Sequence, residues 1–189
     1  MRALLAAVLL ALALAGCATG APDAPATEPD VPPPPVEMLP PIVPDSVEIP
    51  SIGAQSSLVA LGRGPDGGWA VPDVQHPEQA SWYSDGPVPG SRGPAVILGH
   101  VNGGGRPGVF ARLGELQAGA EVLVRGQDGR TVTFVVTRIQ RELKTAFPSG
   151  EVFAAVPDAQ LRLITCGDRF DPSTGHYVGS VIAYAVARL

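Results

Sequence analysis

Leu161-Arg162-Leu163-Ile164-Thr165-Cys166-Gly167 is the stretch of this 189-residue chain on which the fold assignment depends. Apolar and β-branched residues lead to a cysteine and then a glycine, a pattern typical of a buried strand that ends at a turn. A second stretch, Ala95-Val96-Ile97-Leu98-Gly99-His100, is also apolar and ends on a histidine. If the two strands are neighbours, a thiol and an imidazole lie together at one rim of a sheet.

Four further apolar, β-branched runs are separated by turn signals, at residues 57–61, 121–124, 131–139 and 181–187. Asp128-Gly129, between two of them, is a strong hairpin signal, and residues 131–139 alternate partly, as a half-buried strand does. Helical signal is limited to short pieces around 108–116 and 149–155. Residues 48–189 are therefore predicted to form one mainly β domain, most plausibly a closed or nearly closed barrel with short helices.

The first 16 residues have the form of a secretory signal peptide. Arg2 precedes a run of Ala, Leu and Val that is short for a transmembrane helix, and small residues follow it. Leu14-Ala15-Gly16-Cys17 resembles the lipobox of bacterial lipoproteins, in which the signal is cut before a cysteine that receives a diacylglycerol. The alternative is an ordinary signal peptide that contains a cysteine. We expect Cys17 to be lipidated, and the protein to be exported and anchored to the outer face of the cytoplasmic membrane.

Residues 17–47 are predicted to be a disordered linker. Eleven prolines lie between Ala18 and Pro50, mixed with Ala, Asp and Glu. Such a composition cannot form a core and favours an extended, polyproline-like spacer. A proline-rich recognition motif for a partner domain is the alternative.

The charge balance argues against nucleic acid as a partner. The chain has 13 Lys and Arg against 18 Asp and Glu; removal of Arg2 with the signal leaves 12 − 18 = −6. No basic cluster stands out, whereas phosphate neutralisation needs concentrated positive charge.

Cys166 is the only thiol left after Cys17 is assigned to the anchor. It is then a reactive nucleophile, a small buried hydrophobe, or half of a disulfide between chains. His100 is either a hydrogen-bonded structural histidine or the base that activates this thiol. A zinc site is disfavoured, because the mature chain has no second cysteine and His76 and His176 lack ligand spacing with the pair. Their joint placement at strand ends favours catalysis.

At these residues the chain resembles the sortase family, the cysteine transpeptidases of Gram-positive cell surfaces. The resemblance rests on the strand ends at His100 and Cys166 and extends through nearly all of residues 50–189. The further stretches that carry it are Trp82-Tyr83, Pro89-Gly90, Gly108 to Leu116, Gly119 to Val124, Phe170-Asp171 and Gly175-His176-Tyr177. Within the family the chain looks most like the actinobacterial class E or F type.

The resemblance implies an eight-stranded barrel of sortase type and a two-step reaction without a metal or organic cofactor. Cys166 would attack the Thr carbonyl of a Leu-Pro-X-Thr-Gly-like sorting signal, forming a thioacyl intermediate that an amine resolves. His100 would act as general acid and then as base, and Thr165 would help shape the acyl site. The implied partners are surface proteins with a C-terminal sorting signal and an amine acceptor, such as a cell-wall precursor or a pilin lysine.

The chain departs from the family pattern at the third catalytic residue. Sortases use an arginine on or just before the strand after the cysteine to bind the substrate carbonyl and the oxyanion. Residues 178–184 contain no arginine here. Arg169 is the nearest candidate, His176 is a possible substitute donor, and Arg92 and Arg188 are more remote. Arg169 is equally explained as a solvated loop charge. The displaced arginine leaves a non-catalytic surface lipoprotein that binds a ligand as an alternative function. A sortase-like hydrolase is a second alternative, because the nucleophile that resolves the thioacyl enzyme is a separate molecule.

Overall fold

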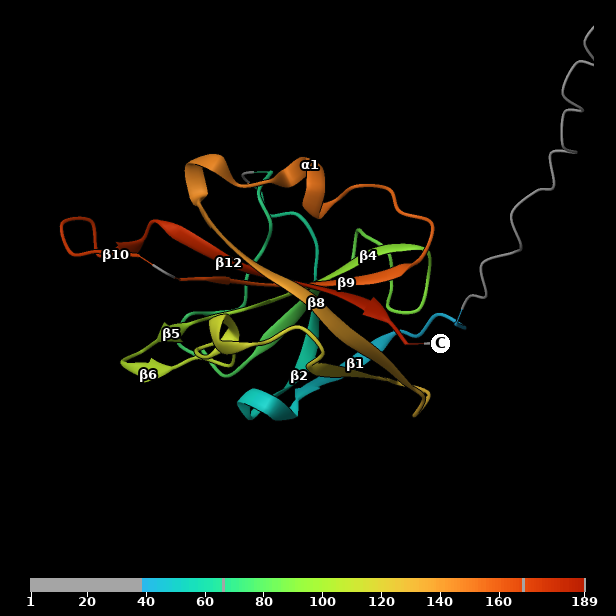
Figure 1. The fold of residues 1–189 in the computed structure, drawn as a ribbon. Coiled ribbons are helices and arrows are strands. Elements are labelled where there is room, and N and C mark those ends of the chain that lie inside the picture. The colour runs from blue at the N-terminus through green and yellow to red at the C-terminus, as the bar shows by residue number, and fades with distance from the viewer. Residues whose placement is uncertain (1–38, 66, 168, 189) are drawn as a thin grey trace, which may run out of the picture. The chain divides into compact units, whose positions relative to one another are not determined.

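The computed structural model describes residues 39–65, 67–167 and 169–188, and within them eight strands close into a barrel (Figure 1). The strands lie in the order β1-β2-β3-β4-β9-β12-β8-β7, and antiparallel pairing of β1 with β7 completes the ring. Among the strand pairs of these described residues, only β2 with β3 and β4 with β9 are parallel. The bounds are β1 Pro44–Ile49, β2 Ala54–Leu61, β3 Ala80–Tyr83, β4 Gly93–Gly99, β7 Glu121–Gly126, β8 Thr131–Leu143, β9 Ala159–Cys166 and β12 Gly179–Ala187.

Short elements occupy the connections. Two small hairpins are formed by β5 Asn102–Gly103 with β6 Arg106–Pro107 and by β10 Phe170–Asp171 with β11 His176–Tyr177. The helices are η1 Pro50–Ile52, η2 Leu113–Glu115, η3 Lys144–Ala146 and α1 Ser149–Val152. The mainly β class with short helices is thus confirmed, and two of the helices lie in the predicted segments.

All six predicted strands are present, and the hairpin at Asp128-Gly129 joins β7 to β8. Gly129 adopts φ 80°, a conformation that side chains disfavour, and its N–H donates to the Gly126 carbonyl. Asp128 Oδ1 accepts from the Arg130 N–H. The sequence analysis missed β1 and β3, because β1 begins among prolines and β3 has only four residues.

The linker does not extend to residue 47, as the sequence analysis expected, since β1 begins at Pro44. Ile42 and Val47 are each only 2% exposed, and the Ile42 N–H donates to the Pro89 carbonyl. Apolar side chains between the prolines supply part of the core, so the folded domain begins before residue 48.

The predicted signal peptide and Cys17 lie outside the described residues. Within the part of the chain that the structure describes, no helix has the length and apolarity needed to span a bilayer.

The barrel wall buries apolar side chains on both of its faces. Leu161 and Leu163 of β9 belong to the core cluster inside the barrel, whereas Ile164 belongs to a second cluster on the outer face. Because side chains alternate along a strand, Cys166 follows Ile164 on the outer face. The connection from β8 to β9, including α1, arches over this face in Figure 1 and adds Val152 and Phe147 to the outer cluster. The β8–β9 connection therefore covers part of the outer face, and β9 ends at Cys166 on this same face.

Candidate active site

Cys166 and His100 are brought together by the parallel pairing of β4 with β9. The register places Leu98 beside Ile164. His100 lies two positions after Leu98, and Cys166 lies two positions after Ile164. Parallel strands end at the same edge of a sheet. The condition set in the sequence analysis, that the two strands are neighbours, is therefore met, although one strand lies far before the other in the sequence.

The two side chains line one pocket of about 230 Å³ with mainly apolar walls. The walls come from four regions: the β2–β3 connection, the end of β4, the β8–β9 connection and the ends of β9 and β12. The lining residues are Trp69, Val71, Pro72, Leu98, Gly99, His100, Lys144, Phe147, Ile164, Thr165, Cys166 and Ser180. A thiol in the wall of an apolar pocket can react with an extended peptide bound in that pocket.

Aromatic contacts join the two connections that form the roof of this pocket. The Trp69 ring packs edge-on against Phe147 and Phe153, with centroids 5.4 and 4.8 Å apart. Phe153 also contacts the Tyr83 ring on the barrel, with a centroid distance of 6.3 Å. The β2–β3 and β8–β9 connections are therefore held against each other and against the sheet.

The half-buried His100 ring is oriented by a backbone carbonyl. Its Nε2 lies 2.7 Å from the Pro72 oxygen, which can only accept a hydrogen bond. The neutral ring must then carry its proton on Nε2, so the Nδ1 lone pair is left for a second partner. This contact sets the tautomer and leaves Nδ1 as the nitrogen that can exchange a proton.

Gly108 allows the loop after His100 to fold back on it. A Cβ at Gly108 would lie 2.1 Å from the His100 oxygen, well inside any real contact. The same carbonyl accepts from the Phe110 N–H, and the Gly108 N–H donates to the Val101 carbonyl. Glycine at residue 108 is thus required for the backbone position of His100.

Cys166 is exposed and is the free cysteine within the described residues. Thr165, 3% exposed, donates from Oγ1 to the Cys166 carbonyl oxygen at 3.2 Å. The Gly167 N–H donates to the Gly179 carbonyl. The backbone on both sides of the thiol is therefore held while the sulfur itself faces solvent.

Comparison with known proteins identifies the fold and the family. A family model described as the sortase domain matches residues 47–187. The chain belongs to the sortase family. No curated protein sequence matches it significantly.

Solved sortases share this barrel at low sequence identity. Sortase A from Corynebacterium diphtheriae is 21% identical with a TM-score of 0.58, covering 80% of this chain and 62% of that one. Sortase C from Clostridium perfringens SM101 is 15% identical with a TM-score of 0.57, and the match covers 78% of this chain and 70% of that one. Sortase A from Listeria monocytogenes is 17% identical with a TM-score of 0.56, and the match covers 79% of this chain and 89% of that one. These structures support the sortase fold, and the class E or F assignment stays a prediction.

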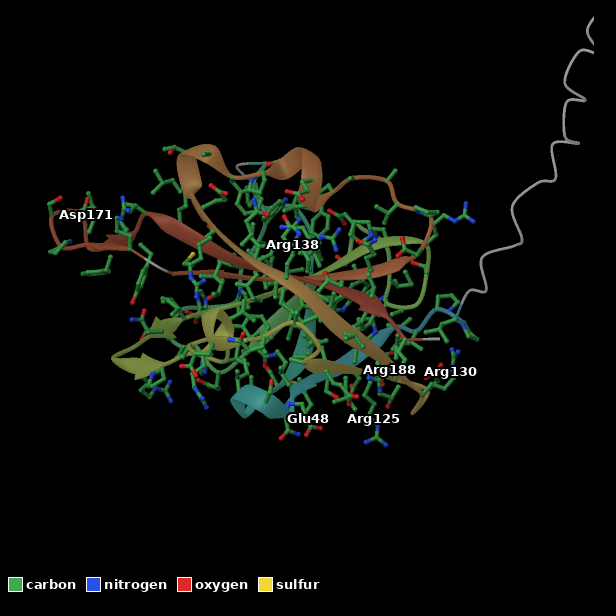
Figure 2. The ribbon with its side chains drawn as sticks, in the orientation of Figure 1. Glu48, Arg125, Arg130, Arg138, Asp171 and Arg188 are labelled. Carbon is green, nitrogen blue, oxygen red and sulfur yellow. The ribbon has the colours of Figure 1, made fainter. Side chains whose placement is uncertain are left out.

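Arg169, the predicted third catalytic residue of this sortase, is not among the described residues that line the pocket. It is exposed and precedes the β10–β11 hairpin, where its carbonyl accepts from the Val178 N–H. His176 lies in the same hairpin opposite Asp171, which Figure 2 shows on the part that projects from the barrel. Arg188 forms an ion pair with Glu121 at 2.6 Å. A role for Arg169 stays a prediction.

The sequence analysis named His100, Thr165 and Cys166 of this lining, and among the residues that it missed are two with polar side chains. Ser180 is the strand partner of Cys166 on β12, and Lys144 enters the pocket from η3. Neither belongs to a sequence motif, but Lys144 is the only lysine in the chain and could have been found by counting. The described residues contain no group of three or more His, Cys, Asp or Glu side chains placed to hold a metal.

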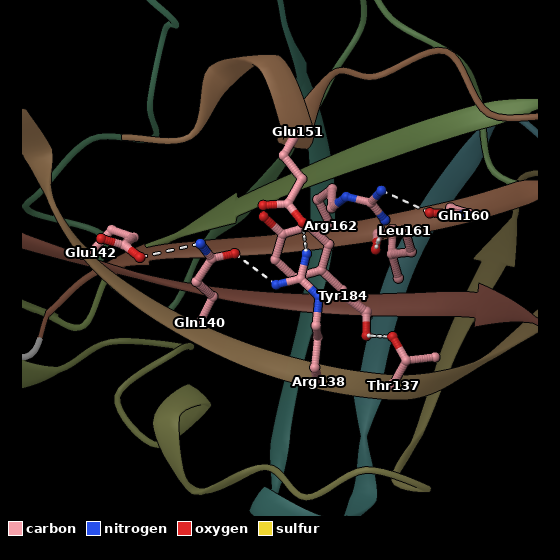
Figure 3. A network of polar contacts seen from close by, with 9 residues as sticks. All are labelled: Thr137, Arg138, Gln140, Glu142, Glu151, Gln160, Leu161, Arg162 and Tyr184. Atoms are coloured by element: carbon pink, nitrogen blue, oxygen red, sulfur yellow. Dashed lines mark hydrogen bonds and ion pairs between the residues drawn. The ribbon is translucent and has the colours of Figure 1, made fainter. Parts of the chain in front are cut away.

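A stacked polar network lies on the same outer face, beneath the β8–β9 connection (Figure 3). Two guanidinium groups contact the Tyr184 ring of β12. The guanidinium carbon of Arg138 on β8 lies 3.4 Å from the ring centroid, and that of Arg162 on β9 lies 4.5 Å from it. Arg138 also pairs with Glu151 of α1. Burial lowers the pKa of Arg162 and raises the pKa of Tyr184. The network ties α1 to the barrel wall and so supports the roof of the pocket.

Proposed function

We propose that this sortase is an exported cysteine transpeptidase that cleaves a Leu-Pro-X-Thr-Gly-like sorting signal and transfers it to an amine. The observation that carries the proposal is the shared pocket of Cys166 and His100 at the ends of adjacent parallel strands. A thiol beside an imidazole is the arrangement that nucleophilic thiol catalysis requires. Membership of the sortase family supports the same reaction.

In the first step the Cys166 thiolate attacks the carbonyl carbon of the substrate threonine. The carbonyl electrons move onto oxygen, and collapse of this intermediate breaks the C–N bond and leaves a thioester. Nδ1 of His100 first takes the thiol proton of Cys166, because Nε2 is engaged by Pro72, and then donates this proton to the leaving amine. In the second step Nδ1 takes a proton from the incoming amine, which attacks the thioester and releases Cys166.

The pocket walls suit the apolar part of such a signal. Trp69, Val71, Phe147 and Ile164 offer apolar surface next to the thiol, and a leucine and a proline would bury their side chains against it. Thr165, through its bond to the Cys166 carbonyl, would hold the acyl site in place.

We also propose that Cys17 carries the lipid that holds the enzyme at the outer face of the cytoplasmic membrane. Substrates there would be exported proteins with a C-terminal sorting signal, and the acceptor would be a cell-wall precursor or a pilin lysine. In cells, Cys17→Ser should release the protein from the membrane fraction and abolish palmitate labelling. Labelling that persists in this variant would contradict the anchor.

The reaction is tested by incubating the full-length Cys17→Ser protein with a sorting-signal peptide, with and without an amine. A thioester on Cys166 in the intact mass and a ligated peptide with the amine are expected. Cleaved peptide without ligation would indicate a hydrolase, and an unmodified enzyme with unchanged peptide would indicate a binding protein.

The matched controls are Cys166→Ala and His100→Ala. Cys166→Ala should give no thioester. His100→Ala should lower the acylation rate by about 10²–10⁴-fold, the contribution of a positioned acid–base group. Slow labelling of Cys166 by a thiol-reactive probe in the folded wild-type protein would contradict an activated nucleophile.

A further inference from the structure

The cation closest to the chemistry in the described pocket is Lys144. The chain contains 12 arginines and one lysine, and that lysine lines the pocket together with Cys166 and His100. No arginine is among the described residues that line this pocket. The single lysine of the chain thus lies in the wall of the pocket that holds the nucleophile.

The place of Lys144 is set by β12, the strand that flanks Cys166. The Lys144 N–H donates to the Val178 carbonyl at 2.8 Å, at the start of the strand whose Ser180 is the register partner of Cys166. Ser180 lies on the thiol's side of β12, and the residue directly before the strand is Val178. Lys144 therefore brings a positive charge to a part of the site where β12 supplies none.

The ammonium group is available, whereas nearby guanidinium groups are engaged elsewhere. Within the described residues, Lys144 Nζ makes no hydrogen bond or ion pair, and its side chain is exposed. Arg138 pairs with Glu151 and Gln140, and Arg141 donates to the Gly114 carbonyl. Arg162 is buried against Tyr184. Lys144 is thus free to bind a substrate oxygen.

We propose that Lys144 is the catalytic cation of this enzyme, binding the scissile carbonyl oxygen and the oxyanion that develops on it. This inference rests on the function proposed above. As the sulfur–carbon bond forms, the carbonyl π electrons move to oxygen, and the Lys144 ammonium donates a hydrogen bond to that oxygen. Lys144 itself keeps its proton: collapse of the intermediate restores the carbonyl, and His100 protonates the leaving amine. Preorganised donors aimed at a developing oxyanion act in this way.

The test compares Lys144→Met, Lys144→Arg and Arg169→Ala in the full-length Cys17→Ser protein. Lys144→Met should lower the rate of Cys166 acylation by a sorting-signal peptide by about 10²–10³-fold, with a smaller change in KM. Lys144→Arg keeps the positive charge but places it on a planar guanidinium group, and it should retain a rate within about tenfold of wild type. Arg169→Ala should be close to wild type, because this residue lies outside the described pocket lining.

A second readout needs no sorting signal. The rates at which Cys166 reacts with iodoacetate and with iodoacetamide report the local charge, because the reagents differ by one negative charge. Loss of a cation beside the thiol should lower the iodoacetate-to-iodoacetamide rate ratio several-fold in Lys144→Met and leave it unchanged in Arg169→Ala. This ratio locates the charge even in an enzyme that accepts no peptide.

The outcomes separate the two proposals. Normal acylation in Lys144→Met, or a hundredfold loss in Arg169→Ala, overturns the role of Lys144 and leaves the transpeptidase intact. An acyl adduct on Lys144 itself also overturns it, because an acylated amine is neutral. If the wild-type protein forms no acyl-enzyme while its iodoacetate-to-iodoacetamide ratio still depends on Lys144, the transpeptidase proposal is overturned. The catalytic role of Lys144 is then overturned with it.

Discussion

At the scale of single residues, the site depends on backbone contacts more than on contacts between catalytic side chains. The Pro72 carbonyl determines which nitrogen of His100 can exchange a proton, and the Thr165 hydroxyl bonds the Cys166 carbonyl. The close approach of Gly108 holds the His100 backbone. Small backbone displacements should therefore have large effects on the rate and small effects on the fold.

Gly108→Ala should lower the acylation rate of Cys166 at least tenfold. Its Cβ would meet the His100 oxygen at 2.1 Å, so the backbone of the histidine must shift. A misplacement of about 1 Å can cost about 10²-fold in rate. Single-turnover mass spectrometry measures the effect. Gly150→Ala is the control, because a Cβ there meets nothing within 4 Å; equal rates for the two variants would contradict the prediction.

At the scale of elements, the pocket is assembled by strand ends and by two long connections that lie over the sheet. The aromatic contacts of Trp69 hold the connections together, and the pair Glu151–Arg138 fastens α1 above Tyr184. Arg162, the register partner of Tyr184 on β9, lies with its guanidinium carbon 4.5 Å from the ring centroid. The outer network thus stabilises the pocket without contributing a reacting group.

Arg162→Ala should reduce the free energy of unfolding by about 2–4 kcal/mol, since a side chain that is 3% exposed and contacts the Tyr184 ring is removed. Arg162→Met should cost about 1 kcal/mol or less, because the stem is retained and the buried charge is removed. Urea denaturation measures both. Arg125→Ala, an exposed site on β7 labelled in Figure 2, should stay within about 0.5 kcal/mol. Equal losses in the two Arg162 variants would contradict the account.

The β7–β8 hairpin should show a pH-dependent contribution from Asp128. Hydrogen bonds from Arg130 hold the pKa of this carboxyl below its usual value of 3.8. A lowered folded-state pKa stabilises the fold above the unfolded pKa, and this stability is lost as the pH falls through the folded value. Asp128→Asn should therefore be less stable than wild type at pH 7, with the difference shrinking below about pH 4. Thermal unfolding from pH 7 to 3 measures it, and a constant difference would exclude a role of the charge.

At the scale of the whole molecule, barrel closure depends on a strand that lies among prolines. β1 pairs with β2 on one side and with β7 on the other. Without it both neighbours would have open edges, which favour aggregation. The segment before residue 48 is therefore part of the domain that carries the site.

A protein spanning residues 39–189 should unfold cooperatively as a monomer, whereas one spanning 48–189 should aggregate or lose cooperativity. The shorter chain lacks Pro44 to Val47 and the buried Ile42. Burial of two such side chains contributes about 3–6 kcal/mol, a large share of the usual 5–15 kcal/mol. Size-exclusion chromatography and thermal unfolding decide between these outcomes. Equal stability of the two proteins would show that β1 is dispensable.

The sequence by itself determined the mainly β class, six of the eight barrel strands, the Asp128-Gly129 hairpin, the end of β4 just before His100 and the end of β9 at Cys166. These features follow from alternation, β-branched content and turn chemistry, all of which act between near neighbours in the chain. Tertiary structure alone decided that β4 and β9 are parallel partners and that Pro72 orients His100. It also decided that Lys144, rather than Arg169, lines the pocket, and that β1 closes the barrel. Each of these depends on contacts between segments that are distant in sequence, and no local pattern encodes which distant segments meet.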